Sequence, residues 1–498
     1  MHSTLVSAIL PDEEELIESC NRKISANPKD TEAYVLRARA FLHRGQFDTA
    51  IADLDNAIRL DPSLAVAYLF RGVAYDEVHR VDDAISNFKE AASIDPAGCV
   101  AAFNELGTIY FELGQSEAAI EHYSKAIEIK NSEPIFYYNR AVALMSLPHP
   151  TDAIADYTNA IQLNPKFADA YVGRGMALST MGKLAEAIKD YDQALLLTPD
   201  DIPLRLCRAM DYSKSGQCDS AIQDCLEVLK REPGNVIAYN TKGLAEQAKG
   251  DLQAAEADYN RALDIEPENP QVHMNRAALF TSTGRLSAAL EDYDLAIRLM
   301  PENPRLYIKR GLVHYARGDR EKAILDYSRS LGIKPTETGY YNRGLALAYD
   351  GQLRKAIDDY NRGIELNPKD AKLYFGRGWA FEKLGQCKLA LHNYSMAISL
   401  NKDFWEAYNA KAWLLICCPE AELRDPKSAT QAALTACQLS NWNQWACIDT
   451  LAQAYAVMGD FDQATHYQKT ALSKSGFTNA ERSEMEQRLN LYAQKKAC

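Results

Sequence analysis

Arginine and aspartate recur along this chain at one fixed separation, and both side chains can bind charge. Arg310 precedes Asp326 by sixteen residues, and Arg343 precedes Asp359 by the same distance. A column of guanidinium groups could bind phosphates or carboxylates, whereas an arginine that meets an aspartate forms an ion pair inside the fold. The same separation recurs in Arg37 and Asp53, Arg140 and Asp156, Arg174 and Asp190, Arg208 and Asp224, and Arg276 and Asp292.

Two segments lose both members of this pair at once. Leu106 and His122 stand at the two places in one segment, and Leu451 and Tyr467 stand there in another. Joint loss predicts that the arginine and the aspartate contact each other, with the arginine stem covering apolar surface. The acids would also neutralise an anion-binding column, so a structural ion pair is the favoured interpretation and anion binding is the alternative. Altered versions of the pair are Lys242 with Asp258, Arg71 with Asn87, and Arg377 with Asn393.

Motifs for catalysis and metal binding are absent from the sequence. Gly175 to Lys183 ends in Gly-Lys like a phosphate-binding loop, but six residues separate its glycines and Leu184 replaces the hydroxyl residue. No HExxH, GxSxG or GxGxxG motif occurs. The eleven cysteines include no CxxC pair, and no histidine stands near the adjacent Cys417 and Cys418. We therefore expect reduced, buried cysteines, no catalytic residue, no metal site and no cofactor.

Size and charge exclude several classes of protein. The chain has 498 residues, a formal net charge of −13 and a pI of about 5.3. Nucleic acids and anionic membrane surfaces require clustered lysine and arginine, which this acidic chain lacks. No apolar run approaches the roughly 18 to 20 residues of a membrane-spanning helix. The start, MHSTLVSAILPDEEELIESC, has no basic segment ahead of its acids, so we expect no signal peptide and a cytoplasmic protein.

Proline recurs about every 34 residues and marks an internal repeat. The prolines stand at positions 28, 62, 96, 165, 199, 233, 267, 301, 335 and 368. Between them, apolar and small residues fall at helical spacing on both sides of a glycine, as in Tyr307, Gly311, Gly318, Ala323 and Tyr327. Each repeat is predicted to be a helix, a tight turn and a second helix that ends before the proline. One hairpin cannot bury its apolar face alone, so the hairpins must stack.

This order of residues resembles the tetratricopeptide repeat, with its period, its helical hairpin and its Tyr-Gly-Tyr-Ala-Tyr-Ala-Pro order. About thirteen repeats are expected, starting near residues 31, 65, 100, 134, 168, 202, 236, 270, 304, 337, 371, 405 and 445. The resemblance implies an all-α solenoid that winds into a right-handed superhelix. Its expected parts are an N-terminal capping helix in 1–30, eleven repeats in 31–404, two divergent repeats in 405–477 and a C-terminal capping helix in 478–498.

The twelfth repeat departs from the pattern, because its turn contains about five extra residues. The sequence around this turn resembles the C-terminal unit of tetratricopeptide proteins found in planctomycetes and related bacteria. The matching pieces are Cys418-Pro419, Arg424-Asp425, Ala436-Cys437 and Ile448-Asp449-Thr450-Leu451. The resemblance points to a bacterial cytoplasmic protein.

The family resemblance also implies an inner groove lined by the first helix of each repeat. In that family the second, fifth, ninth and twelfth residues of a repeat face a ligand. Here the fifth and ninth places are mainly apolar, and they lack the lysine and asparagine pairing with which chaperone-binding members hold a terminal carboxylate. For any single residue, the alternative is packing between neighbouring first helices. The residues expected to form a partner-binding groove are Tyr138, Tyr315, Tyr341, Phe375, Trp379 and Trp413.

The function expected from these features is that of a non-catalytic scaffold whose groove binds an extended or helical protein segment. The alternative is a regulatory subunit of an enzyme complex that docks through its convex face. An enzyme is disfavoured because the repeats leave no stretch for a catalytic domain. The expected partner is a protein or peptide, without nucleic acid and without membrane insertion. Nothing in the sequence indicates an oligomeric state.

Overall fold

The computed structural model of the protein describes residues 13–496. Residues 1–12, to which the expectation of no signal peptide refers, and residues 497–498 lie outside the described residues. The N-terminal part of the expected cap in 1–30 therefore also falls outside them. All regular secondary structure in residues 13–496 is helical. No helix in this described part has the length and apolar character needed to cross a membrane.

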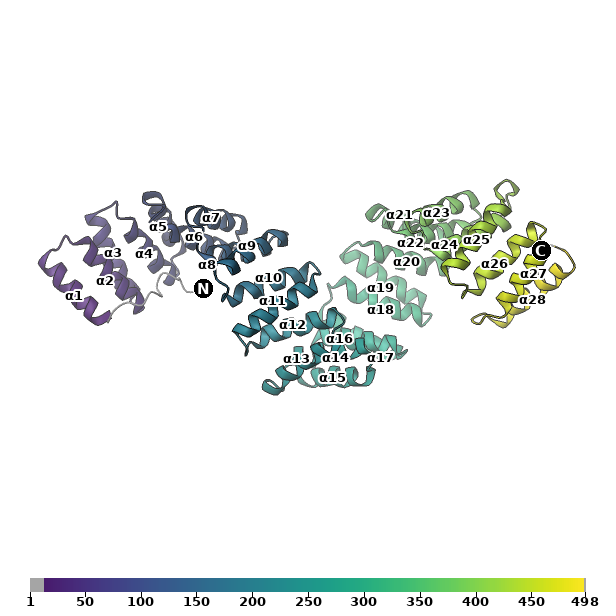
Figure 1. Ribbon diagram of the computed structural model, residues 1–498, viewed down its shortest axis with the longest axis horizontal. Coiled ribbons are helices and arrows are strands. Elements are labelled where there is room, and N and C mark those ends of the chain that lie inside the picture. The colour runs from purple at the N-terminus through teal and green to yellow at the C-terminus, as the bar shows by residue number, and fades with distance from the viewer. Residues whose placement is uncertain (1–12, 497–498) are drawn as a thin grey trace. The chain divides into compact units, whose positions relative to one another are not determined.

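Helices α2 to α27 pair into thirteen hairpins, and each first helix begins at the residue predicted for the start of its repeat (Figure 1). The expected all-α architecture of about thirteen stacked hairpins is confirmed. The first helices are α2 (Thr31–His43), α4 (Ala65–Glu77), α6 (Val100–Glu112), α8 (Pro134–Met145), α10 (Ala168–Thr180), α12 (Ile202–Lys214), α14 (Val236–Lys249), α16 (Pro270–Ser282), α18 (Pro304–Ala316), α20 (Glu337–Tyr349), α22 (Ala371–Lys383), α24 (Trp405–Cys417) and α26 (Trp445–Val457).

The second helices run antiparallel to the first and have similar lengths. They are α3 (Phe47–Leu60), α5 (Val81–Ile94), α7 (Ser116–Ile129), α9 (Pro150–Leu163), α11 (Leu184–Leu197), α13 (Cys218–Arg231), α15 (Leu252–Ile265), α17 (Leu286–Leu299), α19 (Arg320–Ile333), α21 (Leu353–Leu366), α23 (Cys387–Leu400), α25 (Pro426–Leu439) and α27 (Phe461–Leu472). A separate helix precedes the first hairpin, α1 (Glu13–Ala26), and another follows the last, α28 (Asn479–Ala493). A short 3-10 helix, Ala421–Leu423, lies in the long turn of the twelfth hairpin.

Small residues in the first helices let the second helices approach closely. In the ninth hairpin, a Cβ atom at Gly311 would lie 2.6 Å from the ring of Tyr327, which is closer than two carbon atoms can pack. Tyr327 is only 1% exposed, so its ring fills the space that the absent side chain leaves. The turn between these helices contains Gly318 with φ +85°, a left-handed conformation that other residues rarely adopt. The glycine and tyrosine pattern of the sequence therefore has a steric basis.

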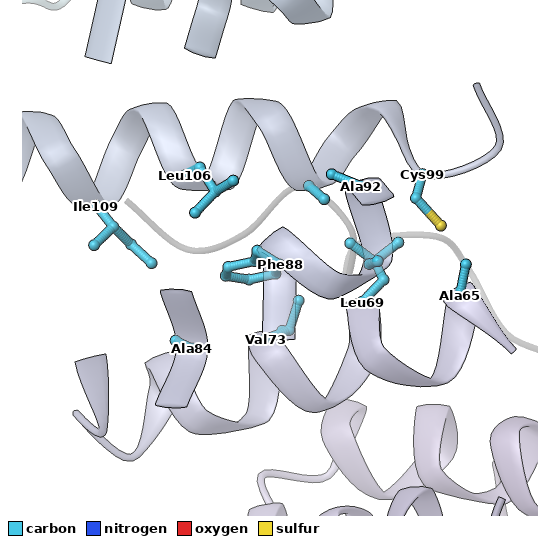
Figure 2. Close-up of a cluster of buried hydrophobic side chains, with 11 residues drawn as sticks. Ala65, Leu69, Val73, Ala84, Phe88, Ala92, Cys99, Leu106 and Ile109 are labelled. Carbon is cyan, nitrogen blue, oxygen red and sulfur yellow. The ribbon is translucent and has the colours of Figure 1, made fainter. Parts of the chain in front are cut away.

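The aromatic residue of the second hairpin also packs against the next hairpin. Figure 2 shows Phe88 of α5 lying between Val73 of α4 and Leu106 of α6. Phe88 and Leu106 are each 1% exposed. The core is therefore a layer that runs from hairpin to hairpin, and every hairpin depends on its neighbours for burial.

Two compact units make up the chain, Met1–Asp258 and Tyr259–Cys498, which we call the N-terminal and the C-terminal unit. Within each unit most first helices contact the first helix of the next hairpin, whereas successive second helices make no comparable contact within either unit. The hairpins of each unit therefore lie closer together on the side of the first helices than on the side of the second helices. The first helices form the inner surface of the unit. The contacting first helices are α2 with α4, α6 with α8, α8 with α10, α12 with α14, α16 with α18, α18 with α20, α20 with α22, α22 with α24 and α24 with α26.

The sixteen-residue pairs are ion pairs within single hairpins, as predicted. Arg310 donates from Nε to Oδ2 of Asp326 at 2.9 Å and from Nη2 to Oδ1 at 2.6 Å. The side chain of Asp326 is 4% exposed and that of Arg310 is 22% exposed. This bond raises the pKa of Arg310 further above its usual value. The same double contact is made by Arg37, Arg140, Arg174, Arg208, Arg276 and Arg343.

These arginines also reach the preceding hairpin, a contact that the sequence pattern did not predict. Arg310 donates from Nη1 to Oδ1 of Asp294 in α17 at 2.6 Å. Arg208 does the same toward Asp192 in α11, also at 2.6 Å. With all three nitrogens engaged inside the stack, little of the guanidinium is left for an external anion. The geometry therefore supports a clamp that joins three helices rather than an anion-binding column.

The thirteenth hairpin lacks the repeated pair, and α28 supplies a different one. Arg488 of α28 donates from Nη2 to both carboxylate oxygens of Asp449 in α26, each at 3.0 Å. Gln468 of α27 donates to Oδ1 of the same aspartate at 2.8 Å. Because Asp449 is only 5% exposed, this network fixes the terminal helix against the last hairpin.

Candidate partner-binding surface

An apolar stripe follows the first helices at the ninth residue of successive hairpins. Met176 is 49% exposed and Leu312 is 39% exposed, although both side chains are large and apolar. Contiguous exposed apolar surface on a folded protein usually marks a binding site. The stripe consists of Met176, Met210 and Leu244 in the N-terminal unit and of Leu312, Leu345, Trp379 and Trp413 in the C-terminal unit.

Three aromatic residues from successive first helices form a continuous row in the C-terminal unit. The ring centroids of Tyr315 in α18 and Tyr349 in α20 lie 6.4 Å apart. Tyr349 in turn stacks on Trp379 of α22, with ring centroids 5.2 Å apart. Tyr349 is 50% exposed, so the middle of the row is open to solvent. We call Tyr315, Tyr349 and Trp379 the aromatic row.

Two other predicted groove residues pack toward the core between hairpins. Tyr341 is half-buried and lies against the buried Tyr360, with ring centroids 6.3 Å apart. Phe375 is also half-buried and contacts Tyr394 and Phe404, at centroid distances of 5.7 and 5.0 Å. These side chains pack between neighbouring hairpins, and only part of the surface of each side chain is exposed to solvent.

Tyr138, the predicted groove residue of the N-terminal unit, lines an apolar hollow. The hollow has a volume of about 300 Å³, and its walls include Val142, Met145, Val172 and Met176. One carboxylate, that of Asp169, stands at its edge. The size and the lining suit one large apolar side chain of a partner.

Trp413, which follows Trp379 in the apolar stripe, lines a hollow of about 270 Å³. The walls of this hollow include Trp445, the Asp449–Arg488 pair and the carboxylates of Glu481 and Glu484. Two indole faces beside carboxylates suit a basic side chain. The structure therefore brings Tyr315 and Trp379 together and leaves Tyr138 and Trp413 in separate hollows.

A polar hollow lies on the other side of the C-terminal unit, between the second helices α19 and α21. Its volume is about 330 Å³, and its walls include Ser328, Lys355, Asp358 and Arg362. Mixed charges of this kind suit a polar docking surface rather than an apolar segment.

His273 lies buried near the start of α16 and is 4% exposed. Nδ1 lies 2.8 Å from Oδ1 of Asp292, and Nε2 lies 2.9 Å from the carbonyl oxygen of Pro267. Both neighbours are acceptors, so the ring satisfies both only when both nitrogens carry a proton. The bond to Asp292 raises the pKa of His273 against the opposing effect of burial. The geometry fits a structural ion pair and not a metal ligand.

This arrangement predicts a pH-dependent contribution of His273 to stability. Because the pKa of His273 is higher in the native state than in the unfolded state, protonation of His273 stabilises the fold. This stabilisation is complete below the unfolded-state pKa of about 6.5 and is lost as the pH rises through the native-state pKa. The difference in melting temperature between the wild type and His273→Gln should therefore be large near about pH 5.5 and small near about pH 8. The same comparison for His149→Gln serves as the control, because His149 is exposed. A difference that grows with pH would contradict the ion pair.

Three buried cysteines of the described chain are poor nucleophiles. All ten described cysteines are free thiols. Burial raises the pKa values of Cys225, Cys437 and Cys447 to about 12. A thiol of this kind is protonated at neutral pH and reacts slowly.

Known families and structures provide an independent comparison. The family model described as TPR repeat matches residues 38–77 and 107–147. Two models described as tetratricopeptide repeat match residues 168–201 and 338–370, and residues 208–271, 240–304 and 281–338. Together these matches cover more than half of the chain. No curated protein has a significantly similar sequence.

Many solved structures are similar to this chain. A tetratricopeptide repeat protein from Parabacteroides merdae is 19% identical, with a TM-score of 0.46, over 50% of this chain and 98% of that one. Yeast Tom70 is 16% identical, with a TM-score of 0.41, over 80% of this chain and 96% of that one.

Proposed function

Because the chain belongs to the tetratricopeptide-repeat family, we propose that it is a non-catalytic scaffold that binds a protein segment on the inner surface formed by its first helices. The aromatic row of the C-terminal unit is the observation that carries this proposal. Aromatic side chains supply large contact areas at low entropic cost, and tryptophan and tyrosine are enriched where binding energy concentrates. A row of three such rings on an inner surface is suited to hold apolar side chains of an extended or helical segment.

The proposed segment combines apolar and basic residues. Leu312 and Leu345 flank the aromatic row on the same first helices and extend its apolar surface. The chain as a whole carries a net charge of −13, which favours a partner with lysine or arginine and predicts association that slows as salt is added. Within the C-terminal unit, Trp413 would contact a basic side chain of the segment, and the hollow beside Tyr138 in the N-terminal unit would by itself suit an apolar side chain. Tyr341 and Phe375 support the surface from the side of the core.

A second candidate function is that of a regulatory subunit that docks through the second-helix side. The polar hollow between α19 and α21 favours this alternative, and so does Leu325 of α19, which is 70% exposed. The two candidates place the partner on opposite sides of the same hairpin. They can therefore be separated by a matched pair of substitutions.

We also propose that the protein acts in the cytoplasm of a bacterium. The free thiols support a reducing compartment, and the pieces around Cys418-Pro419 and Ile448-Asp449-Thr450-Leu451 support a bacterial source.

The test compares Leu312→Asp with Leu325→Asp, two charge insertions in the ninth hairpin. Leu312 lies on the first helix α18 and Leu325 on the second helix α19, and both side chains are exposed, so neither change should unfold the hairpin. Proteins captured from the native cell by the wild type should be lost with Leu312→Asp and retained with Leu325→Asp. The opposite result would favour docking through the second-helix side.

A further inference from the structure

Two buried thiols and a carboxylate meet where the twelfth hairpin departs from the repeat. Cys387 is the first residue of α23, Cys418 follows the last residue of α24, and Glu420 stands two residues further on. The ligand atoms of the three side chains all lie within 4.8 Å of one another. Among residues 13–496, this is the one group of three metal-ligating side chains that converge so closely.

The spacing of these atoms fits a tetrahedral thiophilic cation. Bond lengths of about 2.3 Å to sulfur and about 2.1 Å to oxygen place two sulfurs about 3.8 Å apart, and each sulfur about 3.6 Å from the oxygen. These separations fall within the 4.8 Å that bounds the three ligand atoms. Two thiolates and one carboxylate are a ligand set that zinc accepts, with a water as the fourth ligand.

The long turn is already held in place around these residues. Arg424 donates from Nε to the carbonyl oxygen of Cys418 at 2.7 Å, which folds the turn back onto its own start. Lys388 of α23 pairs with Glu422 of the turn at 3.4 Å. Cys387 and Cys418 are 2% and 0% exposed, so the sulfurs are fixed by packing. A prearranged site of this kind loses little conformational freedom when the ion binds.

From this juxtaposition we propose that Cys387, Cys418 and Glu420 form a zinc site that fastens the inserted turn of the twelfth hairpin to α23. The ion would add a bond between the turn and the preceding hairpin to the Lys388–Glu422 pair and to the packing of Leu423 against this cluster. The competing interpretation is that both cysteines pack as small hydrophobic residues. Cys437 and Cys447 provide the comparison, because both are 0% exposed and lie on adjacent helices. They belong to no group of three metal-ligating side chains among the described residues.

The experiment uses the full chain, reduced with a phosphine, treated with a chelator and desalted. Titration with Co²⁺ should give a thiolate-to-metal charge-transfer band that saturates at one equivalent, and Zn²⁺ should abolish the band. Cys387→Ser with Cys418→Ser should lose the band, whereas Cys437→Ser with Cys447→Ser should keep it. Zn²⁺ should also raise the melting temperature of the wild type and not that of the first variant.

A third variant keeps the test decisive if the serine variant fails to fold. Glu420 is only half-buried, so Glu420→Gln should retain the helical circular dichroism spectrum. It should shift the visible cobalt bands and weaken binding in competition with a chromophoric chelator. Absence of the band in the reduced wild type would overturn the proposal, as would a band that survives the loss of Cys387 and Cys418. Formation of a Cys387–Cys418 disulfide without metal binding in the reduced chain would also overturn it.

Discussion

Replacing Asp326 by alanine should destabilise the ninth hairpin by about 2 to 4 kcal/mol, although the change removes only three heavy atoms. The carboxylate is 4% exposed and holds two donors of Arg310. Without it the guanidinium loses its main acceptor while its stem remains packed in the stack, which costs more than removing both partners. The partial exposure of Arg310 reduces the penalty below that of a fully buried pair. Hydrogen exchange of the amides in α18 and α19 measures the local free energy of opening.

A double-mutant cycle separates the pair from its surroundings. Arg310→Ala and Asp326→Ala should couple by roughly 0.5 to 3 kcal/mol. Arg310→Ala and Asp294→Ala should couple less, because the Asp294 side chain is 56% exposed. Asp292 is the control, because it is bound by Arg276 and His273. The effects of Asp292→Ala and Arg310→Ala on stability should therefore be nearly additive. Simple additivity of Arg310 and Asp326 would show that their contact contributes nothing.

The pairing within a hairpin could be predicted from the sequence, but the contact with the preceding hairpin could not. Arg310 and Asp326 belong to a pattern whose residue types barely change, and joint loss at Leu106 and His122 reveals that the partners meet. The side chain that accepts this second contact differs between hairpins. It is Asp294 for Arg310, Asn260 for Arg276 and Ser124 for Arg140. Because several side chains can accept from Nη1, no single residue type occupies that place in every hairpin.

Trp379→Ala should weaken binding of the partner segment by about 30-fold or more, which corresponds to the roughly 2 kcal/mol lost at an interface hot spot. The indole stacks on Tyr349 at one end of the aromatic row and is half-buried, so the row would lose an anchor. Trp379 also packs against the core cluster that contains Leu347, so the melting temperature should fall, but by less than the loss of a fully buried ring would cause. Titration of the captured segment, with melting measured on the same samples, tests both expectations.

Trp405 provides the matched control. It is also a half-buried tryptophan at a first helix, but it packs against the core of the last hairpins rather than in the row. Trp405→Ala should lower the melting temperature and leave binding unchanged. If Trp379→Ala instead retained binding and cost roughly 3 to 5 kcal/mol of stability, the indole would be a packing residue.

The candidate surface was only partly predictable for two physical reasons. Tyr349 stands at the thirteenth place of its repeat, next to the turn, where the family pattern assigns no ligand contact. It completes the row because α18, α20 and α22 lie side by side, which a single sequence does not reveal. Tyr341 and Phe375 occupy predicted places but lean on Tyr360 and Tyr394, because neighbouring hairpins need large side chains to fill their contact.

The converging thiols were missed for a related reason. Cys387 and Cys418 are separated by a complete helix–turn–helix segment, and only stacking brings their sulfurs together. In the sequence, Cys417 and Cys418 form the conspicuous pair because they are adjacent. In the structure, Cys417 is exposed and Cys418 packs in the core. Distance along the chain is therefore a poor guide to ligand sets in a repeat protein.

Photo-crosslinking from the two sides of the stack tests the proposed binding mode most directly. A benzophenone amino acid is placed at Tyr349 in one variant and at Leu325 in the other, two positions that are 50% and 70% exposed. Each variant is irradiated with the captured partner, and the crosslinked peptide is identified by mass spectrometry. Binding along the first helices predicts a crosslink from position 349 to one apolar segment that contains lysine or arginine, and none from position 325. A crosslink from position 325 with none from position 349 would contradict binding along the first helices.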